Sequence, residues 1–219
     1  MTNADAAAVA PFEDARRVAL IGRAFRLEWF TLGWMTIEAA VAITAGVAAR
    51  SVSLTVFGVD SLIELASAGV LIWRLSVELK RGSTFSEAAE RRASRLAAAL
   101  LFALALYVVA AATWRLWTRE GQSFSWPGLA VTMLAIPVMY LLAKRKLVVA
   151  EKLGSRALRA DAAEAITCGW LSFAVVFGLL AQLALNAWWV DSVTSFAILW
   201  FLIREGREAW NVEDCCDGD

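Results

Sequence analysis

The sequence predicts an all-α, polytopic membrane protein with six transmembrane helices and with both termini in the cytoplasm. Three observations support this fold class. First, 60% of the 219 residues are hydrophobic and the mean hydropathy is +0.60, whereas a soluble domain keeps its apolar fraction nearer half. Second, long apolar stretches alternate with short charged segments, which is typical of a multi-span helical protein. Third, the positive charges are distributed unequally between alternate connecting segments.

Six apolar segments are expected to cross the bilayer, each near the roughly 20 residues that a helix needs to span it. They run from about 28–49, 53–75, 96–117, 126–143, 157–185 and 188–203. Around this membrane domain, residues 27–208, we expect a cytoplasmic or interfacial segment over 1–26 and a short cytoplasmic tail over 209–219. The 1–26 segment is amphipathic and basic, so it either lies on the membrane surface or forms a solvated tail.

The positive charges support this topology. With the N-terminus inside, only Arg50, Arg115 and Arg119 fall in external regions, and the other 18 of the 21 Lys and Arg residues fall on the cytoplasmic side. This asymmetry obeys the positive-inside rule. Omitting one span would destroy it, so the charges favour six.

Composition excludes several classes of function. The chain has no histidine, so His-based catalysis and His-ligated metal sites are excluded. A net charge of zero gives no indication of a nucleic-acid partner. No Gly-rich phosphate loop and no nucleophile beside a base is visible, so we do not expect an enzyme or a bound cofactor. No signal peptide is apparent, and the three cysteines do not suggest a disulfide framework.

The second apolar segment carries two acids where acids are costly. In "VFGVDSLIELASAG", Asp60 and Glu64 are four residues apart and therefore project from one helical face. Two carboxylates at this spacing repel each other in apolar surroundings unless a proton or a cation neutralises them. A single membrane acid can also be purely structural, paired with an arginine or a backbone group. Acids on a second segment make a cation site the favoured interpretation.

The fifth segment repeats the pattern. Its run "RADAAEAITCGW" places Asp161, Glu164 and Cys168 on one face, and no basic partner is apparent for these acids. If the two segments are neighbours, Asp60, Glu64, Glu164 and Cys168 are expected to form a metal site near the bilayer midplane. Carboxylate and thiolate ligands suit Zn²⁺, and the carboxylates also accept Mn²⁺ or Fe²⁺. A cysteine in an apolar helix is as often a small hydrophobe, so the role of Cys168 stays open.

Two further acids are assigned supporting roles. Asp161 is expected near the cytoplasmic interface, as a gate or as a residue at the start of its helix. Glu38 of the first segment is a third membrane acid. It either contributes to a proton path or makes a hydrogen bond between helices, and the sequence does not distinguish these alternatives.

At these residues the chain resembles the cation diffusion facilitator, or cation-efflux, family. The run from Asp60 to Glu64 is similar to the family's acidic motif on its second helix, and "SRALRADAAEAITC" is similar to the ligand motif on its fifth. "WWVDSVTSFAILWFLIREGREAW" resembles the sixth helix. The usual His and Asp of the fifth helix are Glu164 and Cys168 here, and we expect a short member of the family without its usual cytoplasmic C-terminal domain.

The resemblance implies proton-coupled efflux of a divalent cation by a homodimer in a bacterial inner membrane. Zn²⁺ is the first expectation, with Mn²⁺, Fe²⁺, Co²⁺ or Cd²⁺ as alternatives. The tail "NVEDCCDGD" holds Cys215 and Cys216 among acids, and this pair either captures metal for delivery or is inert. The rival function is a membrane sensor or assembly subunit that uses the same fold without transporting.

Overall fold

The structure is a computed structural model, and it contains six α-helices in the part of the chain that it describes, residues 3–81 and 87–210. Side chains are described for residues 18–73, 76, 95–155 and 158–210. The helices are α1 (Asn3–Ala49), α2 (Val52–Arg81), α3 (Glu87–Thr118), α4 (Trp126–Leu153), α5 (Arg156–Leu185) and α6 (Val190–Trp210).

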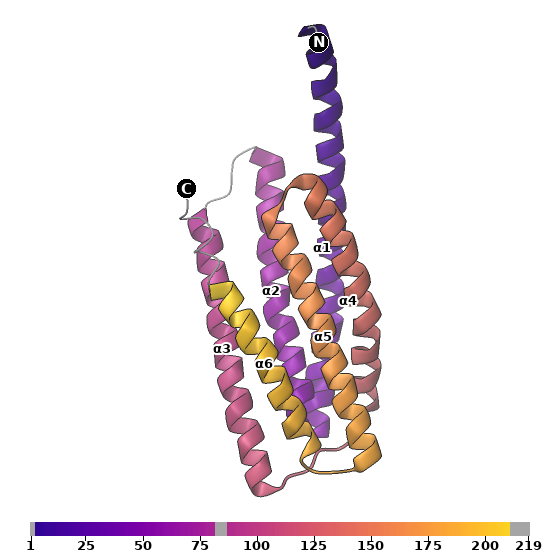
Figure 1. The fold of residues 1–219 in the computed structure, drawn as a ribbon, viewed down its shortest axis with the longest axis vertical. Helices are drawn as coiled ribbons and strands as arrows, with labels where there is room; N and C mark the ends of the chain where they lie inside the picture. Colours follow the sequence, from indigo (N-terminus) through magenta and orange to yellow (C-terminus); the bar gives the residue numbers. More distant parts are fainter. Residues whose placement is uncertain (1–2, 82–86, 211–219) are drawn as a thin grey trace.

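The helices form one elongated bundle in which consecutive helices run in opposite directions (Figure 1). α1 packs against α2 and α4, α4 against α5, and α3 against α6, while α2 also contacts α5 and α6. The start of α1 and the end of α6 lie at the same end of the bundle (Figure 1). We call this the cytoplasmic end, because the segments with most of the Lys and Arg residues lie there.

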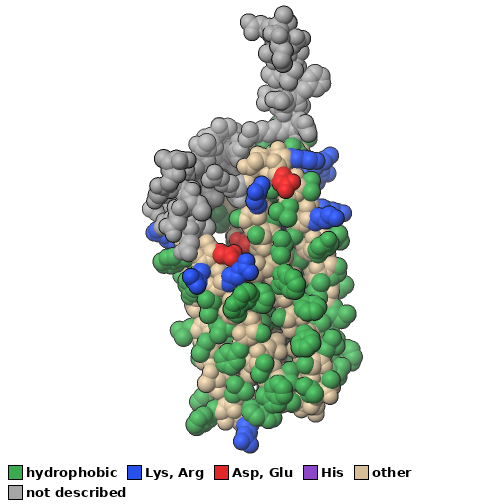
Figure 2. Space-filling view, viewed as in Figure 1, with side chains coloured by type: hydrophobic (Ala, Val, Ile, Leu, Met, Phe, Trp, Pro, Cys, Tyr) green, Lys and Arg blue, Asp and Glu red, His purple; other side chains and the backbone are tan. Residues whose placement is uncertain are grey.

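Five of the helices described are long and apolar enough to cross a membrane, over Val18–Ala49, Val52–Trp73, Arg95–Thr118, Trp126–Leu153 and Leu158–Leu185. α6 does not meet the same test, because four charged residues lie together between Arg204 and Glu208 at its cytoplasmic end. It nevertheless packs within the bundle against α3 and α5. Large apolar side chains cover much of the outer surface (Figure 2), as expected where lipid is the solvent.

The helix boundaries differ from the predicted spans mainly at the cytoplasmic end. α1 is one continuous helix from Asn3, so the predicted 1–26 segment is not a separate element over residues 3–26. α2 and α3 likewise extend beyond the apolar segments. Hydrophobicity marks the part of a helix inside the bilayer, whereas backbone hydrogen bonding continues into the polar region outside it.

Two local features determine where α2 lies. At Gly58, a Cβ atom would come 2.8 Å from the backbone nitrogen of Ile43, so only glycine allows α1 and α2 to approach this closely. At the external end of α2, Asp191 of α6 accepts hydrogen bonds from the backbone nitrogens of Val52 (2.7 Å) and Ser53 (3.2 Å). Asp191 thereby satisfies free N–H groups in the first turn of α2.

Asp191 also connects three helices at the external end. The Ser51 hydroxyl donates to it at 2.8 Å, the Ser53 hydroxyl at 2.6 Å, and Arg115 of α3 lies 3.5 Å away. The side chain is almost fully buried, at 2% exposed. Since all these partners are protein groups, Asp191 has a structural role that fixes α2 against α3 and α6.

Candidate metal centre

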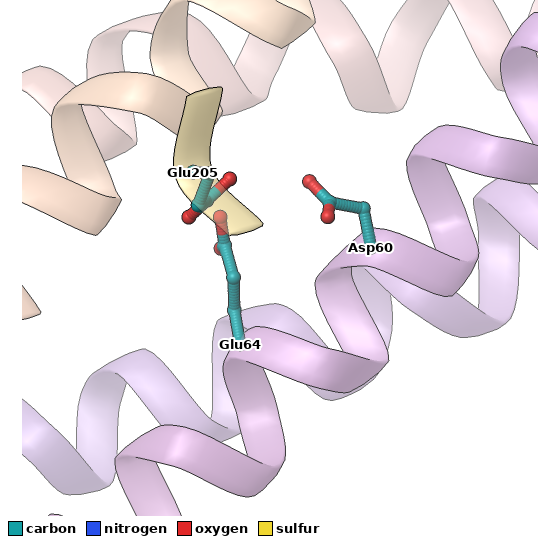
Figure 3. A group of neighbouring side chains, drawn as sticks. All are labelled: Asp60, Glu64 and Glu205. Atoms are coloured by element: carbon teal, nitrogen blue, oxygen red, sulfur yellow. The ribbon is translucent and has the colours of Figure 1, made fainter. Parts of the chain in front are cut away.

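Three carboxylates from two helices converge in the interior of the bundle. Asp60 and Glu64 project from one face of α2, and Glu205 reaches them from α6 (Figure 3). One carboxylate oxygen from each residue lies within 4.8 Å of the others. Asp60 and Glu64 are only 1% and 4% exposed. We call Asp60, Glu64 and Glu205 the carboxylate cluster.

The oxygens of the carboxylate cluster lack protein partners. Among the residues that the structure describes, both oxygens of Asp60, both of Glu64 and Oε2 of Glu205 are buried without a hydrogen bond. Buried polar atoms in folded proteins are nearly always bonded, so such a group needs an explanation. Several carboxylates that face one another without donors repel, and a bound cation would satisfy all of them together.

The sequence interpretation assigned no role to Glu205. Its flanking arginines, Arg204 and Arg207, make the segment resemble a polar helix end at the membrane surface. Helical periodicity contained the signal that was overlooked. Ile198 and Leu202 are fully buried, and Glu205 follows them at the seven- and three-residue spacings that define one face.

The predicted ligands on α5, Glu164 and Cys168, lie next to the carboxylate cluster but are not part of it. Glu164 is half-buried, lies beside Ser67 of α2, and is near enough to Glu205 for electrostatic interaction. It interacts in the same way with Asp60 and Glu64. The structure thus brings the acids of α2 and α5 together, as expected from the sequence, but the closest third carboxylate comes from α6.

Cys168 is buried between α5 and the neighbouring helices, and its thiol donates a hydrogen bond to Glu38 Oε1 at 3.6 Å. Glu38 also accepts from the indole nitrogen of Trp34 at 2.6 Å and from the Ser61 hydroxyl at 2.8 Å. Of the two roles considered for Glu38, the structure shows the hydrogen bond between helices. These bonds connect α1, α2 and α5 beside the carboxylate cluster.

Asp161 forms a buried ionic group with two residues that the sequence interpretation did not use. Lys146 of α4 is fully buried, forms an ion pair with Asp161, and lies 3.2 Å from Glu28 of α1. The expectation that the acids of α5 have no basic partner is therefore wrong for Asp161. Lys146 is also near enough to Glu164 for electrostatic interaction, so this group adjoins the cytoplasmic side of the site.

The periodicity of α4 could have identified Lys146. Its neighbours one turn away on either side, Leu142, Ala143, Val149 and Ala150, are all buried, so it lies on the inward face. In the sequence it is part of a Lys-Arg-Lys run, which suggests positive charge outside the membrane. Cys215 and Cys216, the predicted metal-capture pair, lie outside the residues that the structure describes.

Comparison with known protein families agrees with the fold and with the position of the acids. Residues 30–210 match the cation efflux transmembrane domain family, a range that includes all but the first part of α1 and the tail. A comparison with curated proteins found no match. The matched range covers most of the chain and contains every acid of the carboxylate cluster, so this protein, a polytopic membrane protein, belongs to the cation efflux family.

Proposed function

We propose that the protein exports a divalent metal cation through the membrane in exchange for protons, using Asp60, Glu64 and Glu205 as the primary ligands. One observation supports this most strongly: three carboxylates face one another inside the bundle, and among the described residues both oxygens of Asp60, both of Glu64 and Oε2 of Glu205 are buried without a hydrogen bond. A structural acid would have acquired a partner, as Asp191 and Asp161 have. A transported cation needs ligands that are free when it leaves.

The ligand set indicates which cations suit the site. Three carboxylates and no histidine give a hard, oxygen-rich centre, which suits Mn²⁺ and Fe²⁺ as well as Zn²⁺. In the structure the Cys168 thiol donates to Glu38 and is near enough to Glu64 and Asp60 for electrostatic interaction, so a role as thiolate ligand requires that it lose its proton. We therefore place Cys168 and Glu164 as secondary ligands, and we expect a broader preference than Zn²⁺ alone.

Proton coupling follows from the chemistry of the ligands. A cation and protons are alternative ways to neutralise the same buried carboxylates, so binding one releases the other. A cation that arrives from the cytoplasmic end displaces protons from Asp60, Glu64 and Glu205. After the helices move to expose the site externally, protons from that side compete with the cation and release it.

The remaining assignments also belong to this proposal. We expect a homodimer in a bacterial cytoplasmic membrane. The rival, a sensor or assembly subunit that does not transport, predicts that the cation binds at the carboxylate cluster without crossing the membrane. Transport and binding must therefore be measured separately.

The experiment is a metal panel on proteoliposomes that enclose a pH-sensitive dye. Zn²⁺, Mn²⁺, Fe²⁺, Co²⁺ and Cd²⁺ are added in turn to wild-type protein, Asp60→Asn, Glu64→Gln and the control Glu208→Gln, whose exposed carboxylate pairs with Arg204 at 2.8 Å. The proposal predicts metal uptake with opposite proton movement in wild type and control, and neither in the two site variants. Metal binding without movement in wild type would support the rival.

A further inference from the structure

A second feature lies on the outer surface, between α1 and α4 near the cytoplasmic end. It is a groove of about 860 Å³ lined by residues of these two helices only. Its lining includes four basic residues, Arg23, Arg26, Lys144 and Arg145. No acid lines it. None of the residues of the carboxylate cluster lines the groove, and the transport proposal does not use it.

The basic residues of the groove have no ion-pair partners within the described part of the chain. The ion pairs found there involve other cations, Arg115, Lys146 and Arg204. All four groove cations are exposed. Four unneutralised positive charges around one groove repel one another, and an anion bound among them would relieve that repulsion.

Apolar residues continue the groove toward the middle of the membrane. Phe30 follows Arg26 by one turn of α1, about 6 Å deeper, and is 57% exposed. Leu141 lies one turn deeper than Arg145 on α4, and Val138 follows by another turn. The groove is thus basic toward the cytoplasm and apolar toward the membrane centre, which is the polarity of a phospholipid lying upright beside the bundle.

The depth of the basic residues agrees with this orientation. Arg145 lies about 28 Å along α4 from Trp126 at the external end, close to the ~30 Å thickness of the hydrocarbon layer. Its guanidinium therefore lies at the level of the inner headgroups. In Figure 2 the basic side chains near the cytoplasmic end stand above a surface that is mostly hydrophobic.

We propose that this groove binds an anionic phospholipid of the inner leaflet, with its phosphate between Arg23, Arg26, Lys144 and Arg145 and an acyl chain along Phe30. The basic pocket between membrane helices on the cytoplasmic side supplies the charge. The exposed apolar residues provide the surface against which the acyl chain packs. A zwitterionic lipid has a positive group in its own headgroup, so the four basic residues add less to its binding free energy.

The test is native mass spectrometry of the full chain in detergent, titrated separately with phosphatidylglycerol, phosphatidylcholine, glycerophosphoglycerol and inorganic phosphate. The groove variant is Arg26→Gln/Arg145→Gln. Its control is Lys152→Gln/Arg159→Gln, which removes the same charge from two exposed positions at the same end outside the groove. A second groove variant, Arg23→Gln/Lys144→Gln, replaces the first if that one does not fold.

Each basic residue near an anionic lipid contributes roughly fivefold to affinity. We therefore expect phosphatidylglycerol to bind wild type and control alike and to bind the groove variant about 30-fold more weakly. The proposal would be overturned if the control variant lost as much affinity for phosphatidylglycerol as the groove variant, or if phosphatidylcholine bound wild type as tightly as phosphatidylglycerol. So would equally tight binding of glycerophosphoglycerol or phosphate, which indicates a free-anion site. A groove variant that loses its partner subunit while keeping its lipid would identify the groove as a contact between copies.

Discussion

Glu64 of α2 and Glu205 of α6 point their carboxylates at each other inside the bundle, although one lies in the second helix and the other in the last (Figure 3). Neither Glu64 oxygen has a hydrogen-bond partner among the described residues. The pair is thus unfavourable unless a proton or a cation neutralises it. Contacts elsewhere in the bundle have to hold these two helices in place, and the hydrogen bonds of Asp191 on α6 with Val52 and Ser53 of α2 do so.

Neutralising one acid of the cluster should stabilise the metal-free protein. Asp60→Asn keeps the shape of the side chain and removes its repulsion with Glu64, so the melting temperature in detergent with a chelator at pH 8 should rise by about 2–8 °C. The same variant should lose the further rise that Zn²⁺ or Mn²⁺ gives to wild type. The exposed Glu120→Gln serves as control. A full metal-induced rise in Asp60→Asn would contradict the assignment of Asp60 as a ligand.

Glu205 should matter to metal affinity as much as the acids of α2. Loss of one of three carboxylate ligands by Glu205→Gln should weaken binding at least about tenfold, judged from the effects of perturbing metal sites. Glu208→Gln, one turn away on the exposed face of α6, should change the affinity much less, because its carboxylate pairs with Arg204 outside the cluster. Fluorescence competition with a metal indicator measures both variants. Equal affinities for the two variants would remove Glu205 from the site.

Lys146 should be among the most important residues for stability. Lys146→Met leaves Glu28 and Asp161 buried without a cation, and breaking a buried ion pair in this way costs about 3–5 kcal/mol. Unfolding in detergent followed by circular dichroism measures the loss. Adding Glu28→Gln and Asp161→Asn to Lys146→Met should restore most of it, because no buried charge then remains. Lys152→Met, at an exposed position on the same helix, is the control, and a loss as large there would argue against the ionic group.

Asp191 should stabilise the bundle without taking part in metal binding. Asp191→Ala removes the acceptor for the first N–H groups of α2 and for the Ser51 and Ser53 hydroxyls, so we expect a loss of about 3 kcal/mol or more in unfolding. Asp191→Asn keeps one acceptor oxygen and should lose less. Metal stoichiometry of the folded fraction should stay unchanged in both. A changed stoichiometry would show that the external end contributes to the site.

Much of the fold could be predicted from the sequence, because the bilayer imposes strong rules. Apolar length and charge asymmetry predicted six antiparallel helices with both termini at one end, and the acid spacing on α2 and α5 predicted that Asp60, Glu64 and Glu164 would be near one another. These features depend on local sequence and on the membrane. They need no knowledge of which side chains touch across the bundle.

The residues that were missed are charged groups near helix ends that point inward. Glu205 and Lys146 each belong to a short charged run, and hydropathy averages such a run into a polar boundary. Only the relation of each residue to the buried face of its own helix separates it from its exposed neighbours. Similarly, the thiol of Cys168 donates to Glu38, which also accepts from Trp34 and Ser61, a three-dimensional arrangement that sequence spacing does not reveal.

The most direct test of the central claim is equilibrium dialysis of the purified protein against Mn²⁺ or Zn²⁺ at pH 6 and pH 8. Cys215→Ser/Cys216→Ser serves as the background for every variant, so that thiols of the tail contribute nothing. The account predicts one ion per chain, bound more tightly at pH 8 because binding displaces protons from the carboxylates. It predicts no bound ion in Asp60→Asn/Glu64→Gln. One ion per chain retained in that double variant, at unchanged affinity, would contradict the account.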